Sequence, residues 1–352
     1  MQLEMGFDSP GPVGIFTGRP WLLHAALDPD LVVRMRRDMP LHFQVSDQLL
    51  QVLGVRGVTE PRELERFFYP AIQQLHDPFL LKEMDVAVER MFLACRRAEK
   101  VAVHGDFDVD GLTGCALLVE ALAVLEVDGS RPLPVPGFVP DRATDGYGVA
   151  ERMIREWAAE GVRLLITVET GAAAVTEVTL AGQLGMDVIV LDHHIFEERP
   201  PAVAVINPRR SDAEYPNTEL CGVAVAYKFV QALKERKPGC LPDDFLAGVL
   251  DLVALGLVAD QMSLVGENRI LVKNGLERFN DRELIRPGLA ALLDVSGLDR
   301  GFPVTTGEFA YQLAPRLNAC GRIGRVMSAL ELLLTRDVDR ARSLAEEADR
   351  TN

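Results

Sequence analysis

The sequence of 352 residues lacks several features that would assign a protein to a class at once. Its five cysteines are scattered and form no Cys-x-x-Cys pair, which argues against a zinc knuckle or a disulfide framework and favours buried thiols. No apolar run is long enough to span a membrane, and the N-terminus lacks the basic-then-apolar pattern of a secretory signal. We therefore expect a globular, cytoplasmic protein with no membrane partner.

The sequence also lacks an excess of positive charge. It has 37 Lys and Arg against 52 Asp and Glu, so its formal net charge is −15. Phosphate-binding proteins usually carry a basic surface, so this balance argues against a nucleic-acid partner. Net charge alone does not exclude such a partner, because divalent cations in a catalytic site reverse the sign of the charge locally.

Apolar runs alternate with helical patterns from residue 100 to about residue 206, and from Glu219 onward the pattern is helical almost to the end. Such alternation is typical of a parallel sheet with helices on both faces. The predicted fold is α/β, with a parallel β-sheet flanked by helices and followed by a mainly helical region. Residues 1–99 are expected to form a mainly helical leader subdomain. The predicted strands are 101–103, 164–168, 188–191 and 202–206.

Three of the predicted strands end in acidic residues or histidines, in the segments VAVHGDFD, LLITVET and VIVLDHH. Because parallel strands bring their carboxyl ends to one edge, Asp106, Asp108 and Glu169 should meet the Asp192-His193-His194 cluster there. Carboxylates this close repel one another unless cations lie among them. Carboxylates with one or two imidazoles suit Mn²⁺ or Mg²⁺.

Each of these features also has an ordinary structural explanation. The pair Asp110-Gly111 alone is typical of a turn or a helix cap, and adjacent histidines are often hydrogen-bonded loop residues. The strand ends, however, hold three of the six histidines in the chain, and this coincidence favours the metal site.

Six segments in order carry a resemblance to a known family. The chain resembles the DHH phosphoesterase superfamily, and within it the RecJ-type single-strand exonucleases, from about Leu75 to the end. The segments are HGDFDVDG, TVETG, LDHH, LCGVAVAYKF, DLVALGLVADQMSLVGENRILVKNGL and APRLNACGRIG.

The resemblance implies a site for two ions of Mn²⁺ or Mg²⁺. Glu169 would bridge the ions, His194 would face the substrate phosphate, and Asp192 would orient the imidazoles from behind. Asp251 is the alternative to Asp260, while His104 and Asp110 would assist behind the ligands. The implied metal ligands are Asp106, Asp108, Glu169, His193 and Asp260.

Basic residues near the C-terminus are expected to bind the substrate. By resemblance, Arg316, Asn318 and Arg322 contact the substrate backbone, and Arg316 also stabilises charge during catalysis, since guanidinium groups form a planar fork toward phosphate. The alternative is that these arginines form surface salt bridges. The pair Arg209-Arg210 is short and near acids, so we expect it on a solvated face.

One residue departs from the family pattern. Glu169 stands where RecJ relatives carry aspartate, and the extra methylene moves the carboxylate by roughly 1.5 Å if the backbone stays in place. A bridging ligand displaced by about 1 Å can cost on the order of 10²-fold in rate. Reduced activity, an altered metal preference and a single-metal site are all open.

The resemblance implies a 5′→3′ single-stranded-DNA exonuclease of recombination and repair that activates water with two metals. Its domains would be a catalytic domain over 100–335 and the start of a truncated linking helix over 336–352, without the DHH-associated and oligonucleotide-binding domains. Partners would be single-stranded DNA and a single-strand-binding protein or helicase, with the chain a monomer. Two alternatives are open: an impaired protein that binds nucleic acid or a replication partner, and a phosphodiesterase of short oligonucleotides or cyclic dinucleotides.

Overall fold

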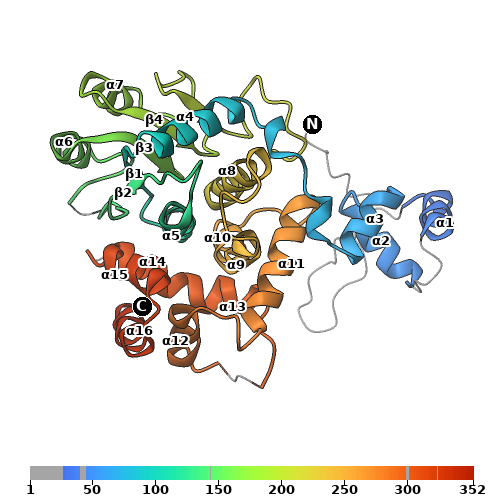
Figure 1. Cartoon of the computed structure of the whole chain (residues 1–352). Coiled ribbons are helices and arrows are strands. Elements are labelled where there is room, and N and C mark those ends of the chain that lie inside the picture. The colour runs from blue at the N-terminus through green and yellow to red at the C-terminus, as the bar shows by residue number, and fades with distance from the viewer. Residues whose placement is uncertain (1–26, 40–44, 143, 299–300, 323) are drawn as a thin grey trace. The chain divides into compact units, whose positions relative to one another are not determined.

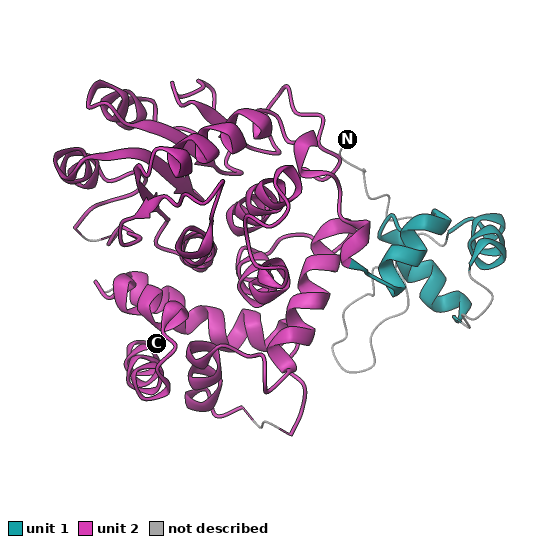
Figure 2. Ribbon diagram, in the orientation of Figure 1, with its two compact units in different colours: residues 1–71 teal, residues 72–352 magenta. Residues whose placement is uncertain are grey.

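The computed structural model describes residues 27–39, 45–142, 144–298, 301–322 and 324–352. The chain divides into two compact units, Met1–Ala71 and Ile72–Asn352 (Figure 2). This division lies earlier than the predicted boundary at 99/100. The reason is helix α4 (Met84–Arg96), whose apolar side is buried in the same core as the sheet of the larger unit.

The smaller unit is helical in its described part. Asp28 and Ser46 cap the first two helices, each by accepting a hydrogen bond from a backbone N–H of the first turn. A small apolar core that includes Met35, Leu50 and Leu64 holds the helices together. They are α1 (Pro29–Asp38), α2 (Asp47–Val55) and α3 (Pro61–Phe68).

The larger unit is built on a five-stranded sheet in the order β2-β1-β3-β4-β5, in which all neighbouring strands run parallel (Figure 1). The predicted fold class is therefore confirmed. The short strand β2 was not predicted, because two residues are too few to form an apolar run. The strands are β1 (Lys100–His104), β2 (Leu133–Pro134), β3 (Val162–Val168), β4 (Asp187–Leu191) and β5 (Ala204–Ile206).

Both faces of the sheet are covered, which explains why its strands are continuous apolar runs. Val101, Val103 and Ile166 belong to the core that α4, α5 and α8 share. Ala102 and Leu165 face the opposite way and pack with residues of α6 and α7. These covering helices are α5 (Val109–Val124), α6 (Glu151–Glu160), α7 (Val175–Gln183) and α8 (Gly222–Arg236).

The chain after α8 is mainly helical, as predicted. Helix α10 is buried on almost all sides, because it packs against α5, α8 and α11. None of the helices in the described residues is both long and apolar enough to cross a bilayer. The elements of this region are α9 (Phe245–Gly248), α10 (Leu250–Ala259), α11 (Gly266–Asn280), α12 (Pro287–Val295), α13 (Thr306–Glu308), the π-helical η3 (Phe309–Leu313), α14 (Ala314–Arg322), α15 (Val326–Leu334) and α16 (Val338–Thr351).

A buried ion pair joins α10 to the start of α12. Both oxygens of Asp251 accept hydrogen bonds from the guanidinium of Arg286, each at 2.9 Å, and neither side chain is more than 2% exposed. Arg286 also donates to the backbone oxygen of Leu333 and to Glu120. Asp251, the alternative ligand in the sequence analysis, is thus fully used by a structural contact.

Replacing Arg286 with methionine should strongly destabilise the protein, because it leaves the buried Asp251 carboxylate without a cationic partner and with only the backbone N–H of Leu252 as a donor. We expect Arg286→Met to lower the free energy of unfolding by about 3–5 kcal/mol in urea denaturation followed by circular dichroism. The control is Arg336→Met, which removes an exposed pair with Glu120 and should cost less than about 1 kcal/mol. Equal losses in the two variants would contradict this account.

Candidate metal centre

The side chains of the predicted site follow the carboxyl ends of three neighbouring strands. Asp106 and Asp108 come after β1, Glu169 comes directly after β3, and Asp192 begins the segment after β4. The parallel register of β1, β3 and β4 brings these ends to one edge of the sheet. Asp260 reaches the same place from the end of α10.

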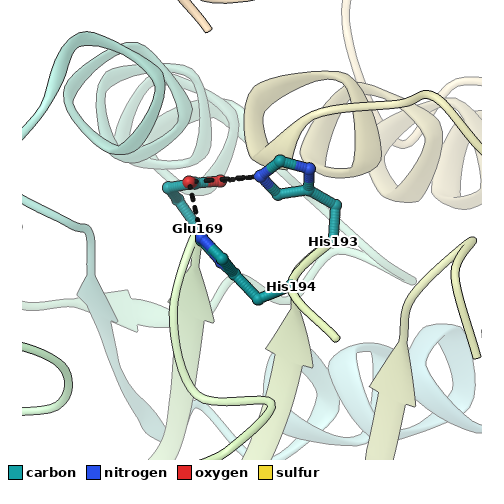
Figure 3. A group of neighbouring side chains, drawn as sticks. All are labelled: Glu169, His193 and His194. Carbon is teal, nitrogen blue, oxygen red and sulfur yellow. Dashed lines mark hydrogen bonds and ion pairs between the residues drawn. The ribbon is translucent and has the colours of Figure 1, made fainter. Parts of the chain in front are cut away.

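The two histidines meet at the carboxylate of Glu169 (Figure 3). His193 Nε2 lies 3.1 Å from Glu169 Oε2 and 3.6 Å from Asp260 Oδ2, and His194 Nε2 lies 3.7 Å from Glu169 Oε1. Two overlapping sets of potential ligands result, each with its ligand atoms within 4.8 Å of one another: Glu169, His193 and His194, and Asp110, His193 and Asp260.

Two carboxylate oxygens in this cluster are buried without an aligned hydrogen-bond donor among the described residues. They are Glu169 Oε2 and Asp260 Oδ2. Burying such an oxygen without a partner is costly, and a cation would satisfy both. A set of carboxylate oxygens with one or two imidazole nitrogens is the donor chemistry that Mn²⁺ and Mg²⁺ accept. The residues present therefore fit these cations.

The acids of the cluster raise one another's pKa values. Burial, followed by the charge of Asp108, raises the pKa of Asp106 to about 7. Burial and the charge of Asp110 raise the pKa of Asp108 to about 6 and that of Asp260 to about 7. The same two causes hold the pKa of Glu169 well above its usual value. Near neutral pH these groups ionise together only at a large electrostatic cost, which bound cations would offset.

Asp110 has a more central position than the sequence analysis gave it. Its two oxygens accept hydrogen bonds from the backbone N–H groups of Gly222, at 2.6 Å, and Val223, at 2.8 Å, at the start of α8. This contact brings the first turn of α8 against the cluster. Gly222 is required there, because a Cβ at this position would lie 2.5 Å from Glu169 Oε2.

Asp192 is hydrogen-bonded along the histidine segment. Its Oδ1 accepts hydrogen bonds from the backbone N–H groups of His193 and His194 and lies 2.9 Å from His194 Nδ1, while Oδ2 accepts from the backbone of Ala172. Burial alone would raise the pKa of Asp192, but the contacts with His194 and the backbone lower it. In return, the contact with Asp192 raises the pKa of His194 to about 8, whereas burial lowers that of His193.

The backbone of Glu169 adopts the left-handed conformation, with φ at 64°. Few non-glycine residues do so, and aspartate and asparagine are the commonest exceptions. The residue that departs from the family pattern thus lies at a position whose backbone is better suited to the aspartate of the relatives.

The predicted substrate residues on α14 are placed differently from one another. Asn318 Oδ1 accepts a hydrogen bond from the backbone N–H of Val109, at the start of α5 beside Asp108. The guanidinium of Arg316 instead donates to Asp349 Oδ1 of α16 at 2.8 Å, and Arg322 is exposed at the end of α14. Within the described ranges, neither arginine contacts the acidic cluster.

His104 faces away from the acids. It is buried, its Nε2 accepts a hydrogen bond from the backbone N–H of Ala150 at 3.0 Å, and its ring packs near Phe138 and Trp157. Burial lowers the pKa of His104 to about 4, so it is neutral near pH 7. Its hydrogen bond with Ala150 holds the segment that precedes α6 against the sheet.

A hollow of about 350 Å³ adjoins the cluster, and sequence analysis missed part of its wall. Tyr147, 68% exposed, lines it, and the guanidinium of Arg142 lies 4.7 Å above the ring of Tyr147. In the sequence, the glycines on either side of Tyr147 were the available signal for this segment. In the structure both have positive φ. Three larger hollows, of about 400, 500 and 620 Å³, lie among other residues and share none with the cluster; the first is lined by Asn318 and Arg322.

The prediction of a solvated face for the pair Arg209-Arg210 is wrong for Arg210. The side chain of Arg210 is 7% exposed and is paired with Glu83 and Asp212. Arg209 is 28% exposed and follows β5, at the same edge of the sheet as the acids.

The comparisons agree with this geometry. The DHH family, N-terminal domain, matches residues 100–257. The single-stranded-DNA-specific exonuclease RecJ of Bacillus subtilis is 37% identical over 88% of this chain and 37% of its own length, and that of Escherichia coli is 35% identical over 90% and 54%.

Solved structures give the same result. A crystal structure of exonuclease RecJ bound to manganese has a TM-score of 0.67 at 36% identity, over 77% of this chain and 66% of that one. RecJ of Thermus thermophilus in complex with Mn²⁺ has a TM-score of 0.74 at 31% identity, over 93% and 44%. The chain belongs to the DHH family. Within that family its homologues are the RecJ exonucleases, and it spans about half the length of the curated relatives it matches.

The cluster should make stability depend on pH and on cations. In EDTA, we expect the thermal midpoint to fall as the pH rises from 6.5 to 8. Asp106 and Asp260, with pKa values of about 7, hold protons in the folded state that the unfolded chain has already lost, and this stabilisation disappears as the pH passes 7. His194, with a pKa of about 8, acts in the same direction, whereas the lowered pKa values of His104 and His193 act below about pH 6.5.

Mn²⁺ should raise the midpoint more at pH 8 than at pH 6.5, because at the higher pH it displaces fewer protons. The measurement is differential scanning fluorimetry with and without Mn²⁺. In the double variant Asp106→Asn/Asp260→Asn, both the fall with pH and the rise with Mn²⁺ should shrink. A midpoint in EDTA that stays level or rises between pH 6.5 and 8 would show that the pKa values of these acids are not raised in the folded protein.

Proposed function

We propose that this chain is a metal-dependent phosphodiesterase that degrades single-stranded DNA from the 5′ end, in the cytoplasm, in recombination and repair. The observation that carries the proposal is the grouping of Glu169, His193 and Asp260 within two overlapping ligand sets, with one buried oxygen of each carboxylate lacking an aligned donor in the described part of the chain. The substrate class comes from the RecJ relatives, which are named as single-stranded-DNA-specific exonucleases. Partners in this proposal are single-stranded DNA and a single-strand-binding protein or helicase, and the chain acts as a monomer.

The proposed cofactor is a pair of Mn²⁺ or Mg²⁺ ions. Asp106, Asp108, Glu169, His193 and Asp260 would hold them, with Glu169 between the two. When bound, such ions lower the pKa of water and neutralise the oxygens of a phosphodiester.

The chain's own residues would supply the remaining functions. In the metal-free protein the contact with Asp192 raises the pKa of His194 to about 8, and 57% of its side chain is exposed. Asp192 contacts Nδ1 of that ring and so leaves Nε2 directed toward Glu169 and the site. From this position His194 can donate a hydrogen bond to a phosphate oxygen and stabilise the charge that develops there.

The residues of α14 complete the proposed site. Asn318 is held at the start of α5, beside Asp108. Arg316 would contact the substrate backbone by exchanging Asp349 for a phosphate, and Arg322 would extend the contact along the strand. Arg316 can leave Asp349 because this carboxylate is 39% exposed, so water can solvate it in place of the guanidinium.

A second candidate is a protein that binds nucleic acid without cutting it. The left-handed backbone at Glu169 favours it, since the residue proposed to bridge the ions is both longer than the aspartate of relatives and poorly suited to that conformation.

Removal of one proposed ligand separates these candidates. With Mn²⁺ and single strands labelled at the 5′ or 3′ end, the parent chain should release mononucleotides from the 5′ end. Asp108→Ala should reduce that release by about 10²-fold or more, because the cations lose a carboxylate. The control is Asp243→Ala, a fully exposed aspartate, which should match the parent. Intact DNA binding with no release from the parent would favour the binding protein.

Shortening the bridging side chain tests the departure from the family. Glu169→Asp suits the left-handed backbone and retracts the carboxylate by roughly 1.5 Å. We expect kcat to rise by about tenfold or more and the Mn²⁺ concentration for half-maximal activity to fall. Glu169→Gln keeps the length, lacks the charge and should lose most activity. A slower Glu169→Asp enzyme that needs more Mn²⁺ would show instead that the site is adapted to glutamate.

A further inference from the structure

The turn after β5 places the positively charged residue Arg209 at the edge of the sheet that carries the acids. Ile206, the last residue of β5, pairs with Leu191 of β4, and its carbonyl accepts a hydrogen bond from the backbone of Asp192 at 3.1 Å. The segment that begins at Asn207 therefore starts beside the Asp192-His193-His194 segment. In the strand order, β4 lies between β3 and β5, so these histidines stand between Glu169 and Arg209.

One buried side chain ties Arg209 to the histidine segment. Asn207 is 1% exposed, and its Nδ2 donates to the backbone oxygen of His194 at 2.8 Å. Its Oδ1 accepts a hydrogen bond from the backbone N–H of Arg209, also at 2.8 Å. Because the same amide holds both residues, the Cα of Arg209 is fixed relative to His194.

The guanidinium of Arg209 is only loosely engaged. Its Nε donates to the backbone oxygen of Thr218 at 3.3 Å, and its Nη2 lies 3.5 Å from the half-exposed carboxylate of Glu219. Its Nη1 makes no contact in the described part of the chain. Arg210, by contrast, is committed to Glu83, Asp212 and the backbone of Val205. Arg209 therefore keeps donors available for a planar anion.

We propose that Arg209 binds a phosphate of the DNA backbone next to the one being cut, on the β5 side of the metal centre. The inference rests on the proposed function and deepens it by assigning the direction in which the strand leaves the cluster. The hollow lined by Tyr147 lies toward β1 and β3, and Arg209 lies beyond β4. A DNA strand that runs from the hollow across the acids would continue to the guanidinium of Arg209. A ligand with a single phosphodiester would not extend to this position.

The test is the salt dependence of binding. The full chain carrying Asp108→Ala, which prevents digestion, is titrated with a fluorescent single-stranded oligonucleotide in Mn²⁺ at 50–300 mM salt. Adding Arg209→Gln should weaken binding and reduce the slope of log K against log salt by about 0.7, the value for one phosphate contact on a single strand. Without Asp108→Ala, Arg209→Gln should raise KM for the same DNA by about tenfold.

Matched variants separate a phosphate contact from a structural role. Arg209→Lys keeps the charge and should restore the slope. Glu219→Gln removes the competing carboxylate and should tighten binding severalfold. Arg131→Gln is the control. Arg131 is also paired with a glutamate, but it precedes β2, the outer strand on the side of the sheet opposite β5. Its salt slope should therefore equal that of the parent.

The outcomes distinguish this inference from the proposed function. If Asp108→Ala alone binds DNA and the parent cleaves it, while Arg209→Gln leaves slope and KM unchanged, the assignment of Arg209 is overturned and the nuclease stands. If the parent neither binds nor cleaves single strands, both are overturned. Should Arg209→Gln fail to fold, unchanged affinity in Glu219→Gln would overturn the assignment.

Discussion

The repulsion among carboxylates buried at one edge of a parallel sheet is the constraint on which the rest of this site depends. Asp106, Asp108, Asp110, Glu169 and Asp260 come from three different parts of the chain, and the folded core removes them from the water that would screen them. The strands beneath are apolar on both faces and hold the edge rigidly, so the acids cannot move apart. Cations are the direct way for such a site to become favourable at neutral pH.

The hydrogen bonds divide these acids into two kinds. Asp110 and Asp192 have both oxygens occupied by N–H donors from α8 and from the loops, so the positions of their carboxylates are set by the backbone. Glu169 and Asp260 each keep one buried oxygen that has no aligned donor among the described residues. The first pair therefore fixes the geometry, and the second has capacity left for a ligand. This distinction follows from satisfied and unsatisfied oxygens rather than from sequence order.

The sheet and the meeting of its acidic ends were predictable, because continuous apolar runs followed at once by polar residues are a local signal. Other features depend on contacts between distant segments and leave no such signal. The sequence does not separate Asp251 from Asp260, since both lie at the ends of one apolar helix, and only the pairing with Arg286 distinguishes them. The same holds for Arg316, whose partner Asp349 is 33 residues away, and for Arg209, whose place depends on the pairing of β5 with β4. The apolar side of α4 was visible, but not that it packs into the larger unit.

The length of Glu169 and its backbone conformation have to be considered together. A side chain lengthened by one methylene would reach about 1.5 Å farther only if its Cβ kept its direction, and that direction depends on φ and ψ. Here φ is 64°, the carboxylate lies against His193, and the first turn of α8 leaves room because Gly222 has no Cβ. Glycine at 222 thus admits the longer acid, while the left-handed backbone adds a strain of order 1–3 kcal/mol that the surrounding contacts must offset. The position of the Glu169 carboxylate oxygens is therefore set jointly by the strand end, by α8 and by the extra methylene.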